Sequence, residues 1–360
     1  MRHGLIIGVL AAALLGAPVA HADDEPPPKT PQPVAVVAAV VPGVLLHGSG
    51  HFALGEKRTA YRLLALDGAG LVALVGGGAT FRLSGAARNL ATPAVGATLI
   101  GASLLVGTWL ADLYGVVLPG SAKGDVLRTA PVLEAEMTTT YAAGPTVAAA
   151  LHVGTAVTAR LGPMAIELGT NVAPAERYDR VEAGLAYRPF GATPGRPSAD
   201  GGFFELGAVA SRVRHGALGF DVTGVDLVTG GRLDLVTVGR TLRGTFAELS
   251  GGAAVRSLTF DHGGTSARPD LALLLQLAFG VSFGRFGDPF RGEAKFYYDH
   301  RHDDDAGGIL GIGRVSGVFG HVGLSGLFLS RSGWGARAYG EIGEAGVVGL
   351  SLLYRVGGGR

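Results

Sequence analysis

The chain has 360 residues, no cysteine and a formal net charge of +1 at pH 7. Without cysteine it can form no disulfide, thiolate nucleophile or zinc-thiolate site, and its near-neutral charge gives no electrostatic footprint for nucleic acid. It combines 61 glycines with 48% hydrophobic residues, an apolarity that a soluble core does not reach with so much glycine. Membrane β-structure is one environment that accommodates both.

The first residues have the composition of an export signal. A basic start is followed by the apolar run GLIIGVLAAALLGAPVA and by small residues at Ala20 and Ala22, which is what a secretory signal peptide needs. We therefore expect a signal peptide over residues 1–22. The charged, proline-rich DDEPPPKTPQP that follows cannot bury apolar surface, so residues 23–33 are expected to be a solvated tether.

Residues 34–120 are expected to form an apolar helical region. The runs at 63–81 and 94–118 are long enough to cross a bilayer as helices, although they carry the acids Asp67 and Asp112. Small residues recur every fourth position, which would let two helices approach closely; they are Ala65, Ala69, Ala73 and Gly77. We expect a helical hairpin within or at a membrane, and the alternative is a soluble helical pair.

The stretch HGSGHFALGEKRT, residues 47–59, has two features of a binding site. It approaches a phosphate-binding loop, but too few residues separate Lys57 from Asp67 to hold the helix and strand that such a loop requires. His47 and His51 are spaced to bind a metal on one helical face, but Gly48 and Gly50 weaken such a helix. A glycine-rich bend is the favoured interpretation, followed by cations (Lys57, Arg58 and Arg62) that meet a membrane surface.

After residue 130 the hydrophobic period changes to two. In LALLLQLAFGVSF, residues 271–283, every odd position is apolar and the even positions are mostly small or polar. The alternation recurs over residues 178–190 and 291–300. Apolar residues outward and charges of both signs inward are typical of a transmembrane barrel. The inward charges predicted to line the lumen are Glu182, Arg188, Glu205, Glu293, Lys295, Arg337 and Glu341.

Thirteen strand-sized segments follow, and a bacterial single-chain barrel should have an even number of strands. They begin near residues 132, 147, 164, 178, 203, 220, 233, 245, 271, 290, 315, 334 and 346. Counting back from the C-terminus places five connections on the outside, namely those near 343–345, 300–308, 261–270, 229–232 and 189–202. This phasing supports the later strands, so the segment at 132–142 is the one that we expect not to be a strand. The prediction is a mainly β chain: an antiparallel transmembrane β-barrel of about 12 strands (10–14) over residues 130–360, preceded by a small α-helical hairpin.

The last predicted strand, GLSLLYRV, resembles the C-terminal β-signal of bacterial outer-membrane proteins through Gly349, Leu352, Tyr354 and Val356. It departs from that pattern because GGGR follows instead of a terminal aromatic residue. Residues 130–360 as a whole resemble bacterial outer-membrane β-barrel proteins, which implies the outer membrane as location, its lipids as surroundings and the barrel-assembly machinery as partner. The PG at 42–43 with the following HGSGH and apolar hairpin is similar to uncharacterised secreted proteins of myxobacteria, and this implies no activity.

The leading functional expectation is a non-enzymatic barrel with a structural, docking or narrow-pore role. It needs no cofactor and binds no nucleic acid, and an envelope protein partner stays open.

Two alternatives remain. One is a barrel hydrolase or acyltransferase acting on lipid or lipopolysaccharide, in which a rim histidine, His300 or His302, works with Asp299 and Ser266. In the same polar cluster Asp303, Asp304 and Asp305 could bind a divalent cation, although an acidic solvated loop is favoured. The other is an inner-membrane helical hairpin that carries a soluble β-domain.

Overall fold

The computed structural model describes residues 32–85, 88–118, 124, 129–144, 149–198, 201–261, 264, 270–285, 287–300, 320–343 and 345–357. The chain divides into two compact units. The helical unit comprises the chain up to Ser121 together with Leu235–Arg243, and the barrel unit comprises Ala122–Asp234 and Gly244–Arg360. The predicted signal peptide and nearly all of the predicted tether lie outside the described residues.

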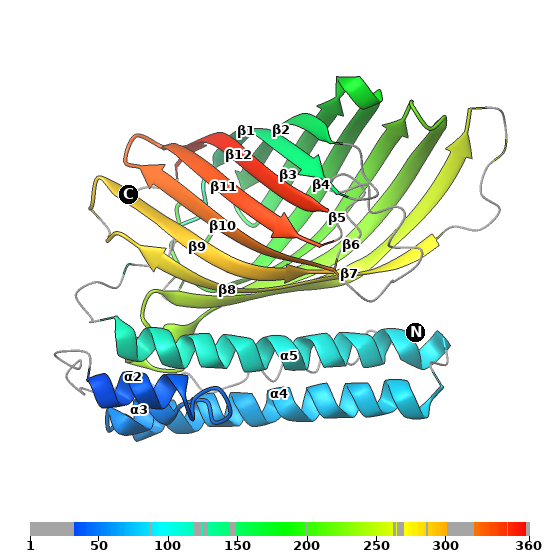
Figure 1. The fold of residues 1–360 in the computed structure, drawn as a ribbon. Helices are drawn as coiled ribbons and strands as arrows, with labels where there is room; N and C mark the ends of the chain where they lie inside the picture. The colour runs from blue at the N-terminus through cyan, green and yellow to red at the C-terminus, as the bar shows by residue number, and fades with distance from the viewer. Residues whose placement is uncertain are drawn as a thin grey trace. The chain divides into compact units, whose positions relative to one another are not determined.

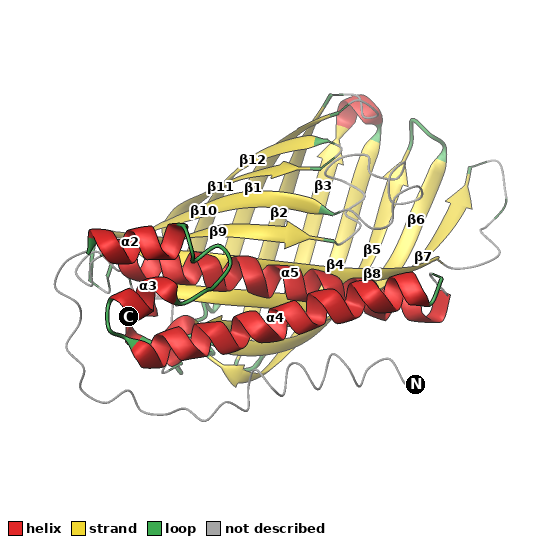
Figure 2. Cartoon of the chain, turned by 60° about the horizontal axis from the view of Figure 1, so that its bottom comes forward, coloured by secondary structure: helices red, strands yellow, loops and turns green. Residues whose placement is uncertain are grey.

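The helical unit contains α2 (Pro33–Val40), α3 (Ser49–Ala53), α4 (Lys57–Leu83) and α5 (Arg88–Val117), with the short 3-10 turns η3 (Leu235–Thr237) and η4 (Arg240–Leu242). The helices α4 and α5 lie side by side as a hairpin (Figures 1 and 2). The expected helical hairpin is therefore present. Glycine is needed at Gly48, where the backbone turns with φ of 96° directly before α3.

Close packing of the hairpin depends on glycines spaced seven apart. Leu63, Gly70 and Gly77 of α4 are buried at this spacing, as are Thr59 and Ala60 near its start, and a Cβ added to Gly101 of α5 would lie 2.3 Å from the backbone nitrogen of Leu74. Of the predicted four-residue stripe, Gly77 is buried against α5, but Ala65 and Ala69 are exposed, so the stripe was wrong at these two positions. A step of four residues drifts further around a helix than a step of seven, so only the latter stays on one face.

The barrel unit is a closed antiparallel barrel in which each strand pairs with its neighbours in the chain and β1 pairs with β12 (Figure 1). This confirms the predicted barrel of about 12 strands. The twelve strands of the described residues are β1 (Leu133–Ala143), β2 (Ala150–Leu161), β3 (Met164–Ala173), β4 (Tyr178–Gly191), β5 (Phe203–His215), β6 (Phe220–Asp234), β7 (Thr245–Phe260), β8 (Asp270–Phe283), β9 (Phe290–Asp299), β10 (His321–Ser330), β11 (Trp334–Ile342) and β12 (Gly346–Val356).

Two strand assignments from the sequence are corrected. The segment at 132–142 is a genuine strand, β1, and it closes the barrel by pairing Leu133 with Val356 and Ala143 with Gly346. The supposed connection at 229–232 lies inside β6, where Gly230 and Gly231 pair with Ser250 and Leu249. Two adjacent glycines favour a turn by composition, but here both belong to a strand paired on each side.

Because no turn occurs at 229–232, the connection between β4 and β5 falls at the other end of the barrel from the one predicted. We call the end of the barrel where β1 begins and β12 ends the terminal end. The strand ends that border 192–202 lie at this terminal end, with those that border 162–163, 235–244, 284–289 and 331–333, whereas the strand ends that border 261–269, 300–320 and 343–345 lie at the opposite end. The prediction that 189–202 lies on the same side as 261–270, 300–308 and 343–345 was therefore wrong.

The two faces of the barrel wall differ as the period of two predicts. On β12 the even positions are exposed and apolar, including Val348, Leu350 and Leu352, whereas Ser351 and Leu353 are buried. The same large exposed residues recur on other strands, as at Leu168, Leu227 and Leu324. The outer face is thus apolar, and the alternate positions point into the lumen.

Candidate functional site

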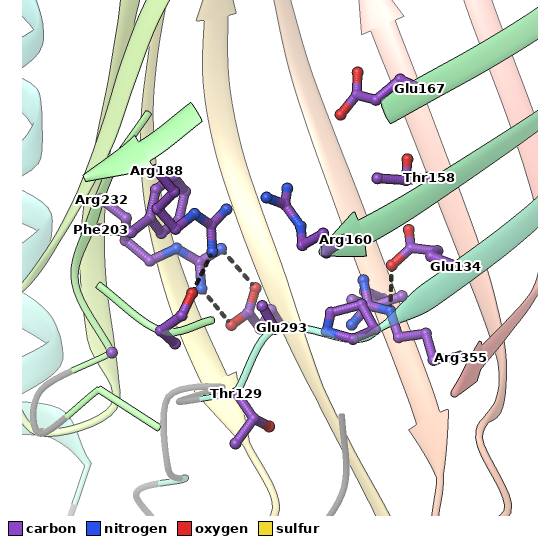
Figure 3. Close-up of a pocket in the computed structure, with 15 residues that line it drawn as sticks. Thr129, Glu134, Thr158, Arg160, Glu167, Arg188, Phe203, Arg232, Glu293 and Arg355 are labelled. Atoms are coloured by element: carbon purple, nitrogen blue, oxygen red, sulfur yellow. Dashed lines mark hydrogen bonds and ion pairs between the residues drawn. The ribbon is translucent and has the colours of Figure 1, made fainter. Parts of the chain in front are cut away.

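Arg232 is the centre of an ion-pair group inside the barrel, near the terminal end. Its Nη2 lies 2.6 Å from Glu248 Oε1, and its Nη1 lies 2.7 Å from Glu293 Oε1. The guanidinium also lies 3.9 Å from the ring centroid of Phe246, and Lys295 Nζ lies 3.0 Å from Glu248 Oε2. Because Arg232 is on β6 and Glu293 on β9, this contact crosses the lumen as a chord (Figure 3).

A second group joins two arginines through one carboxylate. Arg160 Nη1 donates to Glu205 Oε2 at 2.8 Å, and Arg188 Nε donates to the same oxygen at 3.0 Å. Arg188 also stacks on Phe203, with its guanidinium carbon 4.1 Å from the ring centroid. Arg160 is on β2 and Glu205 on β5, so this group also spans strands that are not neighbours.

A third group lies where the barrel closes. Arg355 of β12 donates to Glu134 of β1, and Arg337 Nη1 lies 2.9 Å from Glu136 Oε2. The Arg337 guanidinium also approaches Glu134 at 3.7 Å. Together the three groups place charges of both signs around the terminal end of the lumen, where each cation is paired with a carboxylate.

These groups surround a cavity of about 280 Å³ (Figure 3). It is lined by four arginines and three glutamates, with Thr129, Thr158 and Phe203 between them; the charged residues are Arg160, Arg188, Arg232, Arg355, Glu134, Glu167 and Glu293. The cavity is small because the side chains reach toward one another across it. The terminal end of the lumen is therefore a polar constriction of mixed charge.

The seven residues predicted to line the lumen all lie on the inner face. Five of them belong to the groups just described: Arg188, Glu205, Glu293, Lys295 and Arg337. The other two lie elsewhere on the wall. Glu182 pairs with Arg180 at 2.9 Å, and Glu341 accepts a hydrogen bond from the Tyr297 hydroxyl at 2.7 Å.

Sequence reasoning missed the other charged members of the constriction, which are Glu134, Glu136, Arg160, Glu167, Arg232, Glu248 and Arg355. All seven occupy inward positions of their strands, so extending the alternation to every strand would have found them. Their pairing across the lumen could not be found in that way, because it depends on how the sheet closes.

Glycines on the inner wall make room for large rings that lie against it. An ideal Cβ on Gly280 would be 2.1 Å from the ring of Phe246, and one on Gly349 would be 2.2 Å from the ring of Tyr339. Tyr297 lies over Gly323 in the same way. A side chain at these positions would collide with the rings, which gives part of the high glycine content a physical role.

At the opposite end, a row of rings lines one side of the lumen. The ring centroids of Tyr178 lie 5.2 Å from His152 and 5.4 Å from His215, and His215 stacks on Phe220 at 4.6 Å. Tyr178 also packs in an apolar cluster with Val213 and Val222. This end of the lumen is therefore lined in part by aromatic and apolar contacts, with the Arg180–Glu182 ion pair on the same strand as Tyr178.

The residues of the enzyme alternative are only partly within the described chain. His300 is buried and its Nδ1 lies 3.0 Å from the Tyr298 hydroxyl, while Asp299 Oδ2 accepts a 3.3 Å hydrogen bond from Gln276. The other members of the alternative catalytic and cation sets lie outside the described residues; they are Ser266, His302, Asp303, Asp304 and Asp305.

The two histidines of the HGSGH stretch each contact one of the acids of the helical hairpin. His47 Nδ1 lies 2.6 Å from Asp67 Oδ1 of α4 and 2.8 Å from the Thr108 hydroxyl. His51 Nδ1 lies 2.5 Å from Asp112 Oδ1 of α5, and both side chains are fully buried. Within the described residues, no group of three or more metal-ligating side chains occurs.

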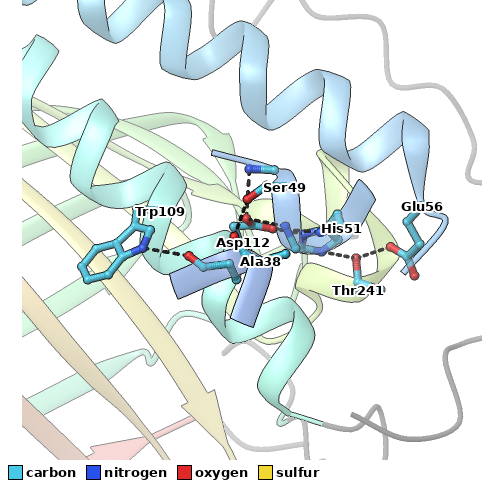
Figure 4. A network of polar contacts seen from close by, with 10 residues as sticks. Ala38, Ser49, His51, Glu56, Trp109, Asp112 and Thr241 are labelled. Carbon is cyan, nitrogen blue, oxygen red and sulfur yellow. Dashed lines mark hydrogen bonds and ion pairs between the residues drawn. The ribbon is translucent and has the colours of Figure 1, made fainter. Parts of the chain in front are cut away.

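The contacts of His51 continue to the segment 235–243 (Figure 4). Its Nε2 lies 3.0 Å from the Thr241 hydroxyl, which donates to Glu56 at 2.8 Å. The backbone N–H groups of Gly48, Gly50 and His51 also donate hydrogen bonds to the Asp112 carboxylate. The bend is thus a structural polar network inside the helical unit.

The residues of the β-signal resemblance lie on β12 and divide between its faces. Leu352, Tyr354 and Val356 are exposed on the outer face, and Tyr354 packs on Trp334 with centroids 4.9 Å apart. Gly349 points inward beneath Tyr339.

The fold and the site define a closed antiparallel β-barrel with an apolar outer face and a charged lumen. No protein-family model and no curated protein matches the chain. Three solved structures illustrate what it is similar to: the KdgM porin (TM-score 0.35, 8% identity, 61% of this chain and 98% of that one), the β domain of the Bordetella autotransporter BrkA (0.36, 13%, 63% and 99%) and the NanC porin (0.37, 7%, 62% and 100%). Likeness at this level does not extend to function.

Proposed function

We propose that the chain is an outer-membrane β-barrel whose lumen is a narrow polar passage of weak ion selectivity. A closed barrel leaves no strand edge unpaired, and its apolar outer face suits a hydrocarbon environment. In this proposal the terminal end faces the periplasm, outer-membrane lipids surround the wall, and the exposed side of β12 is presented to the barrel-assembly machinery. Export by the N-terminal signal peptide belongs to the same proposal.

The observation that carries the pore role is the chord from Arg232 to Glu293. It crosses the lumen between strands β6 and β9 with both charges satisfied, so it narrows the passage without giving it a single sign of charge. The rings of Phe246, Tyr297 and Tyr339 lie close against the wall, over Gly280, Gly323 and Gly349. Mixed charge at a constriction limits flow by size more than by sign.

Planar-bilayer conductance tests the proposal. The wild-type protein should form small channels whose reversal potential in a salt gradient is near zero. The double variant Arg232→Met/Glu293→Gln removes the ion pair that crosses the lumen, and it leaves neither member of the pair as an unpaired charge. Because the passage is then wider, the unitary conductance should rise. The matched control Arg212→Met/Asp221→Asn removes a pair on the outer face, where Arg212 is 65% exposed, and it should leave the conductance unchanged.

The protein used must first be shown to be folded by a shift in gel mobility between unboiled and boiled samples. A folded protein that gives no channels, either as wild type or as the double variant, contradicts the pore role. Recovery in the inner membrane with no mobility shift would instead favour the helical hairpin with a soluble β-domain.

A further inference from the structure

Helix α4 exposes apolar side chains over most of its surface. Leu71 is 53% exposed, Val72 74% and Val75 60%. Only 17% of the most apolar stretch of α4 is buried, and only 22% of the corresponding stretch of α5. A core helix of a soluble protein would bury most of such a stretch, so these helices need an apolar environment.

The carboxylates within the two apolar helices both contact a histidine side chain inside the unit. Asp67 is the one charged residue of α4 between Arg62 and Arg82, and it is bound by His47 at 2.6 Å. Asp112 is bound by His51 and by three backbone N–H groups. Ionisable groups inside a membrane are expected to be paired in this way. Unpaired carboxylates would oppose insertion of the hairpin into hydrocarbon, and the bend provides partners for both Asp67 and Asp112.

The cations of α4 lie at its two ends. Lys57 and Arg58 are exposed in the first turn, and Arg82 is exposed in the last. A helix of 27 residues is about 40 Å long at 1.5 Å per residue, which exceeds the roughly 30 Å of a hydrocarbon core. The cations are therefore spaced to reach the phosphates of both leaflets, and the apolar residues lie between them.

We infer that the α4–α5 hairpin is inserted in a lipid bilayer, with acyl chains covering the exposed face of α4 and the two histidines of the HGSGH bend bound to the hairpin's carboxylates. The pore proposed above does not require this, since the barrel wall closes without the helices. The occupant is lipid because the exposed face is apolar, spans the length of a bilayer and ends in cations that match lipid phosphates.

The absence of cysteine allows a direct test with single-cysteine variants of the full chain. Val72→Cys and Val75→Cys, labelled with an environment-sensitive fluorophore, are reconstituted in phosphatidylcholine and phosphatidylglycerol vesicles that contain doxyl-labelled lipid. Leu324→Cys on the outer face of β10 is the lipid-facing reference, and Leu218→Cys between β5 and β6 is the aqueous reference; both positions are 64–69% exposed.

We expect the two α4 labels to be quenched by 12-doxyl lipid as strongly as Leu324→Cys and to be protected from iodide. Quenching by iodide as at Leu218→Cys would overturn the inference and leave a protein partner as the cover of α4. Quenching by 5-doxyl lipid alone would place α4 at the interface and would also overturn it. The two references report on the barrel separately, so a failure of the barrel proposal is distinguishable.

A second comparison tests the role of the bend. His47→Ala leaves Asp67 without its imidazole and should reduce 12-doxyl quenching at Val72→Cys, whereas His47→Ala/Asp67→Asn should restore it. If His47→Ala has no effect on the depth of the label, the role assigned to the contact between His47 and Asp67 is refuted.

Discussion

Replacing Arg232 by methionine should destabilise the barrel more than any exterior charge substitution. The guanidinium makes four hydrogen bonds of 2.6–2.9 Å to two carboxylates. After the substitution Glu248 keeps Lys295, but Glu293, whose side chain is 6% exposed, loses its cation. Leaving one member of a buried pair uncompensated costs about 3–5 kcal/mol, and we expect a loss of unfolding free energy in this range.

Most of this loss of unfolding free energy should come from the Glu293 carboxylate, which is left buried without a cation. The double variant Arg232→Met/Glu293→Gln should therefore recover about 2 kcal/mol, a coupling typical of residues in direct contact. Arg212→Met is the control: it breaks the exterior pair with Asp221, where Arg212 is 65% exposed, and exposed pairs contribute about 0–1 kcal/mol.

Equilibrium unfolding in urea with lipid vesicles, followed by tryptophan fluorescence and by gel mobility, measures these differences. If Arg232→Met costs no more than Arg212→Met, or if Glu293→Gln restores nothing, the constriction is not held by the ion pairs and the reasoning fails.

Two further predictions concern other contacts. His51→Ala leaves Asp112 fully buried without its imidazole and should cost the helical unit about 3 kcal/mol; hydrogen exchange should become faster in peptides covering 44–60 and 236–243 and stay unchanged in barrel strands. Gly280→Ala forces the buried ring of Phe246 to move and should cost about 1–3 kcal/mol, whereas Gly207→Ala, whose nearest atom is 3.6 Å away, should be neutral in urea unfolding. Equal midpoints for the two glycine variants would contradict the role assigned to the wall glycines.

The architecture of the barrel follows from local patterns in the sequence. The alternation at 178–190 and 291–300 requires only that successive strand residues face opposite sides, and this places Glu182, Glu293 and Lys295 on the inner face. The pattern was less informative where composition conflicts with pairing, as at Gly230 and Gly231, which look like a turn but are held in β6 by both neighbouring strands.

The polar contacts could not be derived in this way. His51 and Asp112 are 61 residues apart, and Arg232 and Glu293 are also 61 residues apart. Both pairs form because separate elements are brought together by packing or by closure of the sheet, and no spacing rule in the sequence encodes that approach. The two histidines four apart indicated a possible metal site, but each one meets a different carboxylate.

The contact of His51 with Thr241 has a consequence for the order of assembly. The two residues are 190 positions apart, and the entropy lost in closing a loop grows with its length. Although the helices of the helical unit are synthesised first, this unit also includes Leu235–Arg243, which follows β6, so it cannot be complete before that segment is present. It can reach its final state only after the chain has been made as far as Arg243, which is more than half of its length, so the helical unit is completed late in synthesis.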